Sequence, residues 1–420
     1  MQMYWSKQEV DCSGWMLRNI SWALVDLPGL TLSLNLSRNK ISQLKERQFE
    51  ELPQLEKLFL QRNSLKTVVP GAFIGVGNLT QLDLSSNSIG NLSIGSFKGL
   101  KKLIILNLEN NCLCCIFKDV FYHLFSLRNL ILSRNKLSEV ANVFQALTDL
   151  STLDSLDISQ NGITNFSVEV EVKIKRLVLC RNNISKLEFS SRFFPYLQKF
   201  DFCQNKIEHM SDDLFRNFTS LTSLVLNNNP LNISVLKHSG LLKLDELYVS
   251  NLAISSSSLS ELCDFSRRVK LRKLIANYNQ ITTIDSEKLA NCSHLKSLSI
   301  SDNRIKSLVK EEFKHTINMQ ALYLGFNHII RIANTTWQNL KNLTKLRVNG
   351  NNFEVVEYLF SPLSRLENLD LGRNKISNIP TTAFLNLNNL KYLNLDYNQI
   401  HDINGAWFKD LRSLKTLEFD

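Results

Sequence analysis

The feature that most constrains this chain is a nine-residue pattern that returns about every 24 residues. Its template is L-x-x-L-x-L-x-x-N, as in LEKLFLQRN (residues 55–63), LTQLDLSSN (79–87), LKSLSISDN (295–303) and LKYLNLDYN (390–398). The closing Asn residues of successive copies lie 21 to 27 residues apart. Sixteen copies follow one another, and a truncated seventeenth starts at Leu414, so nearly the whole chain is one repeat array.

This template is typical of a leucine-rich repeat. In L-x-L the two leucines point to one face and the residue between them to the other, so neighbouring copies should pair as short parallel strands with the leucines inside. The Asn follows the strand, where its amide can bond backbone groups that the turn leaves free. We therefore predict an α/β leucine-rich-repeat solenoid, a horseshoe with a parallel sheet on the concave face and loops and short helices on the convex face.

The far side of each copy should be filled by an aromatic residue ten positions after the Asn. This residue is Phe49, Phe73, Phe97, Phe121, Phe215, Phe313, Trp337, Phe384 or Phe408. Bulky rings make the outer wall thicker than the strand wall, which predicts the bend of the stack.

The ends of such an array need covering, because no copy can bury its leucines alone. We predict an N-terminal capping segment at residues 1–30, in which Cys12, Trp15, Trp22 and Leu27 cover the first copy. Residues 31–420 form the solenoid of about sixteen repeats plus the truncated one. The pattern is still running at Asp420, and residues 1–10 contain no apolar leader, so we expect this stretch to be part of a longer protein.

Two copies depart from the regular length. The copy between Asn161 and Asn182 is short, and its VEVEVK segment (residues 168–173) predicts a strand on the outer wall. The copy around Leu252 spans 27 residues, contains ISSSSLSEL, and has Leu252 where the Asn is expected. These departures fit harmless insertions in surface loops, or a break in curvature that serves as a lip for a partner.

Catalytic signatures are absent from the sequence. There is no G-x-S-x-G, H-E-x-x-H, Walker loop or G-x-G-x-x-G, and the seven histidines do not stand at metal-ligand spacing. The net charge of +10 is spread over 420 residues, which favours an anionic partner only weakly. No run of 18 apolar residues occurs. We predict a binding protein and not an enzyme, with no catalytic residue, no metal site and no cofactor.

Four of the eight cysteines stand at spacings that favour disulfides. Cys180 and Cys203 each lie two positions before the Asn of adjacent copies, and residues so placed on paired strands are about 5 Å apart. Cys263 and Cys292 lie at similar places on the outer wall of consecutive copies. Residues 112–115 read C-x-x-C with an extra cysteine, but no second pair stands at zinc spacing, which disfavours a metal or redox site there.

Acceptors for N-linked glycans are frequent and, with the cysteines, favour a protein of the secretory pathway. They are Asn19, Asn35, Asn78, Asn91, Asn165, Asn183, Asn217, Asn232, Asn291, Asn334 and Asn342. Asn-rich repeats create some acceptors by accident. Asn35 differs from the others because it stands between two inward leucines, so a glycan there would shield the first copy from a ligand.

The outward strand positions form the expected binding surface. Copies ten to fourteen combine aromatic and basic residues near the strands, and these are the candidate ligand-binding residues: Tyr248, Arg272, Lys273, Tyr278, Tyr323, Phe326, Lys345 and Arg347. Aromatic rings beside basic groups suit stacking on bases with phosphate contacts, or an amphiphilic anionic ligand. A strand surface also favours tyrosine through β-propensity alone, so both interpretations stay open.

The chain resembles the ectodomain of a Toll-like receptor over residues 12–420. The resemblance is carried by the 24-residue period with Phe ten after Asn (LSRNKISQLKERQFEEL, residues 36–52), by the irregular middle copies and by the glycan acceptors. Where this family usually has paired cysteines in its N-terminal cap, only Cys12 is found here. The family's C-terminal cysteine cap, transmembrane helix and cytoplasmic Toll/interleukin-1-receptor domain have no counterpart in this stretch.

The resemblance implies the ligand-binding ectodomain of an innate-immune pattern-recognition receptor. Such a receptor binds a microbial ligand (nucleic acid, lipid or protein), forms a homo- or heterodimer on it, and transduces a signal. It would lie on the extracellular or endosomal-lumenal side of a single-pass membrane protein, attached through a segment outside this stretch. The alternative is a secreted or matrix leucine-rich-repeat protein that binds a protein partner without signalling.

Overall fold

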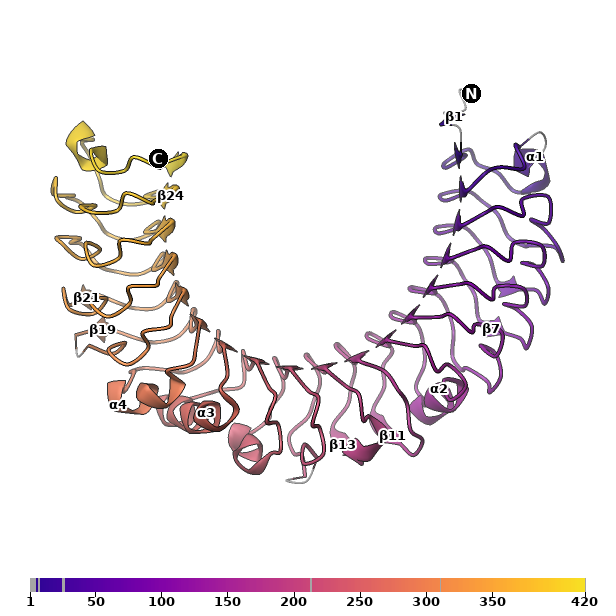
Figure 1. The fold of residues 1–420 in the computed structure, drawn as a ribbon, viewed down its shortest axis with the longest axis horizontal. Helices are drawn as coiled ribbons and strands as arrows, with labels where there is room; N and C mark the ends of the chain where they lie inside the picture. Colours follow the sequence, from indigo (N-terminus) through magenta and orange to yellow (C-terminus); the bar gives the residue numbers. More distant parts are fainter. Residues whose placement is uncertain (1–4, 7, 25–26, 212–213, 310, 420) are drawn as a thin grey trace. The chain divides into compact units, whose positions relative to one another are not determined.

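A computed structural model describes residues 5–6, 8–24, 27–211, 214–309 and 311–419. The chain divides into two compact units, residues 1–221 (unit 1) and 222–420 (unit 2). Within each unit, repeat copies stack so that short parallel strands line one wall and loops and short helices line the other (Figure 1). The predicted α/β leucine-rich-repeat solenoid is confirmed.

The strand wall of unit 1 begins earlier than the pattern predicts. Its strands are β1 (Trp5–Ser6), β2 (Glu9–Asp11), β3 (Ser33–Asn35), β4 (Lys57–Phe59), β6 (Gln81–Asp83), β8 (Ile105–Asn107), β9 (Asn129–Ile131), β10 (Ser155–Asp157), β12 (Arg176–Val178) and β14 (Lys199–Asp201). β2 already pairs in parallel with β3, and buried Val10 and Cys12 occupy the positions that leucines take elsewhere. Trp15 and Leu27 are half-buried, and the side chain of Trp22 lies outside the described part.

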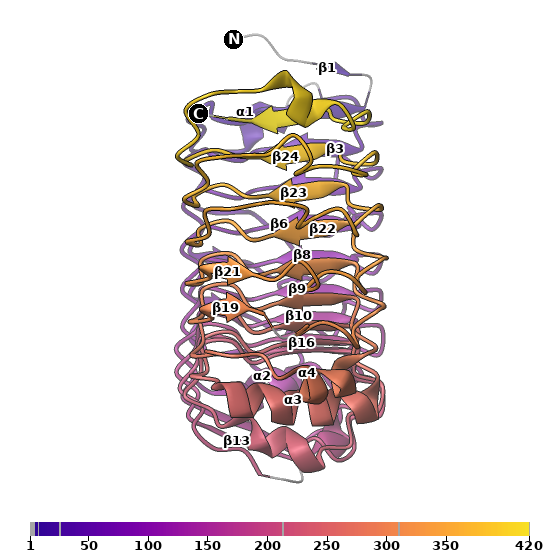
Figure 2. The ribbon, with the colours of Figure 1, turned by 90° about the vertical axis from the view of Figure 1, so that its left-hand side faces the viewer.

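The strand wall of unit 2 continues the same pattern in its own parallel stack (Figure 2). Its strands are β15 (Ser223–Val225), β16 (Glu246–Tyr248), β17 (Lys273–Ile275), β18 (Ser297–Ser299), β20 (Ala321–Tyr323), β22 (Lys345–Arg347), β23 (Asn368–Asp370), β24 (Tyr392–Asn394) and β25 (Thr416–Glu418). The central Leu of almost every strand is buried, and each such side chain contributes about 1.5–3 kcal/mol to folding.

The outer walls hold the remaining short elements. In unit 1 these are α1 (Ser21–Leu24), α2 (Val140–Ala146), η1 (Ser191–Phe193) and the pairs β5 (Thr67–Val68) with β7 (Asn91–Leu92) and β11 (Asn165–Val168) with β13 (Lys186–Phe189). In unit 2 they are η2 (Ile233–His238), α3 (Ser256–Val269), α4 (Ser286–Leu289), η3 (Ala290–Cys292), η4 (Gly405–Phe408) and the pair β19 (Ser307–Leu308) with β21 (Arg331–Ile332). None of the helices in the described part of the chain has the length and apolar character needed to cross a lipid bilayer.

The repeated Asn, here called the ladder Asn, links neighbouring copies. The Nδ2 of Asn63 donates to the carbonyl of Leu60 in its own copy and to that of Leu36 in the copy before, both at 3.0 Å. Its Oδ1 accepts from the backbone N–H of Ile41 at 3.0 Å. The side chain therefore satisfies backbone groups that the turn removes from the sheet. The residue before each ladder Asn, here called the rim position, has a left-handed backbone, as at Arg62 (φ 57°).

The outer-wall aromatics are buried as predicted, with one correction at the last copy. Rings in successive copies stack, for example Phe49 on Phe73 with centroids 6.1 Å apart, and Phe313 on Trp337 at 5.7 Å. In the last copy Trp407 is the buried ring and the predicted Phe408 is only half-buried. The neighbouring residue fills the wall there because η4 turns it inward.

The two irregular copies take forms that the pattern did not predict. In the short copy the outer strand β11 ends at Val168, so the strand expected over residues 168–173 is wrong apart from its first residue. The long copy is not a loop insertion, because its ISSSSLSEL segment begins the 14-residue helix α3, capped by the Ser255 hydroxyl. Leu252 takes the place of the ladder Asn, and the Oδ1 of Asn279 in the next copy accepts from the N–H groups of both Leu252 and Ile254 at 3.0 Å.

Candidate ligand-binding surface

The strand wall of unit 2 carries basic side chains on both sides of the uncharged β20 row. β17, β18, β20 and β22 pair in register, so Tyr323 stands beside Arg347 and Ala321 beside Lys345. The outward residues of these four rows include five basic side chains and no acidic one, and we call this set the basic strand face: Arg272, Lys273, Lys296, Lys345 and Arg347. Such an array raises the local concentration of anions.

Lys273 is held at the edge of this face by a tyrosine. Its Nζ donates to the hydroxyl of Tyr248 at 2.7 Å and lies 4.9 Å from the centre of that ring. The Tyr248 hydroxyl in turn donates to Glu246 at 3.1 Å. The hydrogen bond that Lys273 donates to Tyr248 is the main cause that raises the pKa of Lys273, so its ammonium stays charged at neutral pH.

The other basic groups differ in how far they are neutralised. Arg272 pairs with Asp245, its Nη2 lying 2.7 Å from Oδ2, so its charge is compensated at the start of the strand row. Arg347 lies over the Tyr323 ring at 5.7 Å. Lys345 and Arg347 are exposed, and neither has an ion-pair partner among the described residues. They are the groups best placed to meet an anionic ligand.

Tyr278 and Phe326 lie apart from the strand rows. Both occupy rim positions with left-handed backbones (φ 54° and 51°) and are exposed, by 63% and 49% respectively. They therefore border the basic strand face at the edge where the strands end. The structure brings together Tyr248 with Lys273 and Tyr323 with Arg347, but it does not gather all eight predicted residues into one contact cluster.

Three features of this surface escaped sequence reasoning. Lys296 belongs to the basic strand face, and its place directly after the first Leu of the copy is the signal that would have found it. Asp245 neutralises Arg272 from the neighbouring copy. Arg373 and Tyr397 occupy the rim positions of consecutive copies, and the Arg373 guanidinium carbon lies 4.3 Å from the centre of the exposed Tyr397 ring.

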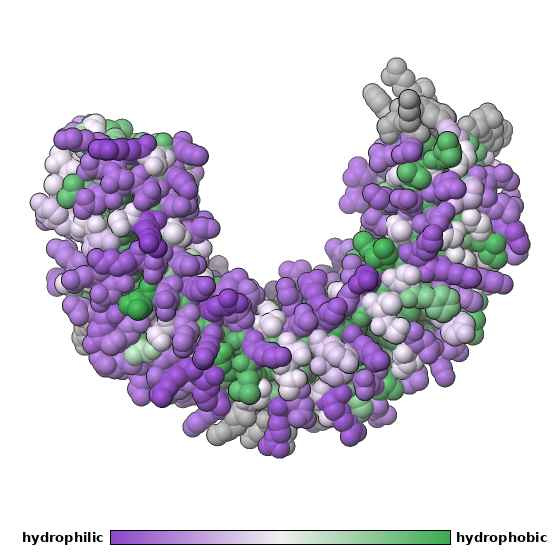
Figure 3. All heavy atoms as spheres, in the orientation of Figure 1, coloured by the Kyte–Doolittle hydropathy of each residue, from purple (hydrophilic) through white to green (hydrophobic). Residues whose placement is uncertain are grey.

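The carboxyl of Asp370, on the strand that follows β22, borders the basic strand face next to Arg347. Desolvation raises the pKa of Asp370, although the Gly372 N–H donates to its Oδ1 at 3.2 Å and Arg347 lies near. Figure 3 shows hydrophilic residues over most of the side of the molecule in view, with hydrophobic residues in small separate patches.

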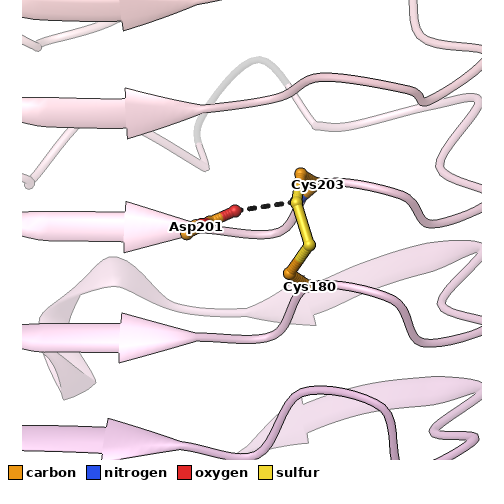
Figure 4. Close-up of side chains that lie close together, drawn as sticks. All are labelled: Cys180, Asp201 and Cys203. Carbon is orange, nitrogen blue, oxygen red and sulfur yellow. Dashed lines mark hydrogen bonds between the residues drawn. A yellow bond between two sulfur atoms is a disulfide. The ribbon is translucent and has the colours of Figure 1, made fainter.

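The four paired cysteines lie where the spacing places them. Cys180 and Cys203 form a disulfide with Cα atoms 4.5 Å apart, and Cys263 and Cys292 form another with Cα atoms 4.9 Å apart. Asp201 lies beside the first bridge and accepts from the Cys203 N–H at 3.0 Å (Figure 4). In the described part of the chain, these are the only three residues of metal-binding type that lie close together. The two sulfurs are bonded to each other, so neither cysteine offers a thiolate to a metal ion.

The remaining cysteines are free in the described part of the chain. Cys12 is buried, and desolvation raises the pKa of its thiol. Cys112 and Cys114 are exposed, and the Sγ atoms of Cys114 and Cys115 lie 3.6 Å apart. They stand at the turn after a ladder Asn and bring no histidine or carboxylate with them within ligand distance.

The predicted glycan acceptors are all at least partly exposed. The most accessible are Asn19, Asn91, Asn165, Asn183, Asn217, Asn232 and Asn334, whereas Asn35, Asn78, Asn291 and Asn342 are half-buried. Asn78 and Asn342 donate from Nδ2 to backbone carbonyls of the preceding copy. Asn35 stands on the strand wall, where its Oδ1 accepts from Ser37.

Comparison with known proteins agrees with this architecture. A family model described as leucine rich repeat matches residues 28–89, 77–137, 172–231, 269–329, 293–353, 317–375 and 364–420. Toll-like receptor 3 of Boselaphus tragocamelus is 29% identical over 349 residues, which cover 77% of this chain and 36% of that protein. Podocan of Mus musculus is 25% identical over 359 residues, covering 77% of this chain and 57% of that protein.

Among solved structures, the crystal structure of a TLR13–ssRNA13 complex matches with a TM-score of 0.69 at 22% identity, over 98% of this chain and 69% of that chain. At that identity the likeness concerns the fold alone. The chain spans well under two thirds of the curated relatives it matches, from 16% of the human leucine-rich repeats and immunoglobulin-like domains protein 1 to 57% of podocan. The predicted resemblance to Toll-like receptor ectodomains is confirmed by the sequence relatives.

Proposed function

Because this chain belongs to the leucine-rich-repeat family, we propose that it is the ligand-binding ectodomain of an innate-immune pattern-recognition receptor of the Toll-like type. The observation that carries the proposal is the basic strand face of unit 2, whose Lys345 and Arg347 are exposed and form no close ion pair in the described part, although Asp370 faces Arg347 on the next strand. The disulfides and the accessible glycan acceptors support placement on the extracellular or endosomal-lumenal side of a single-pass membrane protein.

The proposed mechanism needs no catalysis. An anionic microbial ligand would lie across the strand rows, held by Lys273, Lys345 and Arg347, while Tyr248 and Tyr323 offer ring faces beside those charges. A ligand long enough to extend beyond one surface would engage a second copy of the receptor, and dimerisation would transmit the signal. Nucleic acid, lipid and protein ligands with anionic groups all fit this chemistry.

The first probe is a labelled single-stranded RNA, because the structural neighbour TLR13 was crystallised in complex with an ssRNA. The full chain is titrated by fluorescence anisotropy at several salt concentrations. Each phosphate contact contributes about 0.7 to the slope of log K against log salt for a single strand, so replacing Lys273 and Arg347 together by Ala should lower the slope by about 1.4. Light scattering of the complex should give the mass of two copies.

A charge-matched control removes two lysines from the strand wall of unit 1. Lys57 and Lys199 are exposed and begin their strands as Lys273 does, and the variant with both replaced by Ala should bind as the unmodified chain does. A salt-dependent affinity that survives the Lys273 and Arg347 substitutions would show that the basic strand face is not the binding site. If anionic vesicles bind through the same residues and RNA does not, the basic strand face is still the binding site and the ligand is a lipid.

The second candidate function is a secreted or matrix protein that binds a protein partner without signalling. It is favoured by the similarity to podocan and to lumican of Bos taurus, which is 29% identical over 199 residues. Reading the coding sequence beyond Asp420 separates the two candidates. A membrane-spanning segment followed by a signalling domain supports the receptor, and a stop codon after a short cap supports the soluble protein.

A further inference from the structure

We propose that the groove between η2 and α3 on the outer wall of unit 2 holds an N-linked glycan carried by Asn232. The groove has a volume of about 600 Å³, enough for one or two sugar rings. Ile233 and Ser234, the two residues that follow Asn232, both line it. A sugar attached to Asn232 therefore starts at the mouth of the groove.

The side chain of Asn232 is already oriented for this role. It caps η2, with its Oδ1 accepting from the backbone N–H of Ser234 at 2.9 Å. The capping bond uses the oxygen and leaves Nδ2 without a hydrogen-bond partner among the described residues. Asn232 is exposed, and Asn232-Ile233-Ser234 is an acceptor tripeptide. The cap fixes the plane of the amide and so the direction in which a sugar leaves it.

The lining of the groove suits a saccharide. Leu236, Leu262 and Phe265 lie at the floor of the groove but are almost fully buried, so a sugar ring would pack mainly on the aliphatic stems of Lys237, Glu261 and Arg268 that also line it. Lys237 and Glu261 stand among the lining residues and can bond sugar hydroxyl groups. A pocket with an apolar floor and a few polar groups is the usual composition of a small-ligand site.

The groove is formed before any sugar arrives. The Arg268 guanidinium lies 5.6 Å from the centre of the Phe265 ring on α3 and donates to the carbonyls of Leu236 and Lys237 on η2. The Cys263–Cys292 disulfide ties the other side of α3 to η3. A preformed groove orders a flexible glycan at a lower entropic cost than a groove that must assemble around it.

Asn291 is the other acceptor near this groove, and the structure favours Asn232 over it. The Nδ2 of Asn291 donates to the carboxylate of Asp264, a lining residue, at 2.7 Å. Its amide nitrogen is thus engaged within the protein, and the residue is half-buried. Asn232 alone of the two presents a free amide nitrogen.

The modification is a group transfer that needs a co-substrate from the secretory pathway. The Nδ2 of Asn232 loses one proton and bonds to the anomeric carbon of an oligosaccharide, whose bond to a lipid diphosphate breaks. The inference rests on secretion, which both candidate functions share, and not on signalling or on the basic strand face. Its failure therefore leaves the RNA titration unaffected.

The test uses the full chain secreted from cultured animal cells. Glycopeptide mass spectrometry is expected to find Asn232 occupied. Hydrogen exchange is then compared between this chain and Ser234→Ala, which removes the acceptor and keeps the Asn232 cap. Loss of the glycan should speed exchange of the amides of α3 about fivefold, which corresponds to about 1 kcal/mol.

Two controls keep the outcome specific. Ser234→Thr retains the acceptor and should exchange as the unmodified chain does. Ser185→Ala removes the exposed acceptor Asn183 in unit 1 and should leave α3 unchanged. An unoccupied Asn232 overturns the proposal, and so does an occupied Asn232 whose loss leaves exchange of α3 as it was, since the glycan would then point away and the groove would be open to another partner.

Discussion

Units 1 and 2 are built on one frame but expose different chemistry at equivalent positions. The rim positions of unit 1 include four arginines, namely Arg38, Arg62, Arg134 and Arg181, whereas those of unit 2 include the exposed rings of Tyr278, Phe326 and Tyr397. All seven residues share the same left-handed backbone, with φ between 51° and 59°. The exchange of arginine for an aromatic residue therefore does not alter the turn.

The comparison teaches which residues carry the fold and which are free to carry function. Leucines and ladder Asn residues make the same kinds of contact in both units, apart from the copy in which Leu252 replaces the Asn, so neighbouring copies determine the backbone at the rim and strand positions. Unit 1 has Asp83, Asp157 and Asp201 at the third residue of its strands, whereas unit 2 has Tyr323 and Arg347 there beside a single aspartate, Asp370. The difference between the units is one of surface chemistry on a common scaffold.

The largest effect should come from removing a ladder Asn, and it should be equal in the two units. Asn111 and Asn303 are both buried and each donates to two leucine-position carbonyls while accepting one N–H, from Ile89 and Ile281 respectively. Replacing either by Ala should cost about 3 kcal/mol, because buried backbone groups lose their partners. Urea unfolding and exchange of the Ile89 and Ile281 amides measure it.

The rim neighbours Asn110 and Asp302 serve as controls, because their replacement by Ala should cost only about 1 kcal/mol, through a left-handed backbone that Asn and Asp tolerate better than Ala. If Asn303→Ala lost much more stability than Asn111→Ala, the two units would not share the same structural role for the ladder Asn.

A smaller effect is expected at Gly350, a glycine at a rim position of unit 2. Its backbone is left-handed (φ 65°), and an added Cβ would stand 2.6 Å from Cδ1 of Phe326. Gly350→Ala should destabilise the protein by about 1–2 kcal/mol through the backbone conformation and should also displace the Phe326 ring. Combining it with Phe326→Ala should recover part of the loss, and simple additivity of the two changes would contradict the contact.

The pH dependence of two half-buried carboxyls gives a third, smaller test. Burial raises the pKa of Asp201 in unit 1 and of Asp370 in unit 2. A native pKa above the unfolded value means that the stability linked to each group is full below pH about 4 and is lost as pH rises through the native pKa. Asn at either position should therefore stabilise the protein at neutral pH and not in acid.

Each change also removes an attraction to an arginine, Arg176 for Asp201 and Arg347 for Asp370, so both gains should be small. Thermal unfolding between pH 3 and pH 8 measures both variants, and a gain that persists at pH 3 would argue against burial as the cause.

The smallest effect on stability should come from the rim side chains themselves. Arg62→Ala and Tyr278→Ala keep a left-handed residue in place and remove only exposed groups, so each should change the free energy of unfolding by less than about 0.5 kcal/mol. If a nucleic acid stacks on the rim of unit 2, Tyr278→Ala alone should weaken its binding, by about 1–3 kcal/mol. Equal loss from Arg62→Ala would place the ligand on both units.

The fold could be predicted because one period of about 24 residues repeats the same physical requirements. Leucine spacing determined the strands, and strand register placed Cys180 beside Cys203. The helix α3 was missed because a serine-rich segment favours a loop by composition, although Ser255 is a capping residue and Leu259, Leu262 and Phe265 follow at helical spacing. The start of the ladder at β2 was missed because Val10 and Cys12 stand in for leucines.

The candidate site could be predicted only in part. The repeat period shows which residues of each strand point outward, and this identified Lys273 and Arg347. It could not show that Asp245 in the neighbouring copy neutralises Arg272, because that depends on how two long side chains meet. Nor could it separate Tyr278 and Phe326 at the rim from Tyr248 and Tyr323 on the strands.

The ladder also determines how the protein would respond to mechanical force. Each copy is bonded mainly to its neighbours, so tension between the chain ends is carried by the copies in series and should release them one at a time, each lengthening the chain by roughly 80 Å for 24 residues. The Cys180–Cys203 bridge closes 23 residues into a loop that cannot extend, and the Cys263–Cys292 bridge closes 29. The two disulfides would therefore act as stops that shorten the reach of the stretched chain until they are reduced.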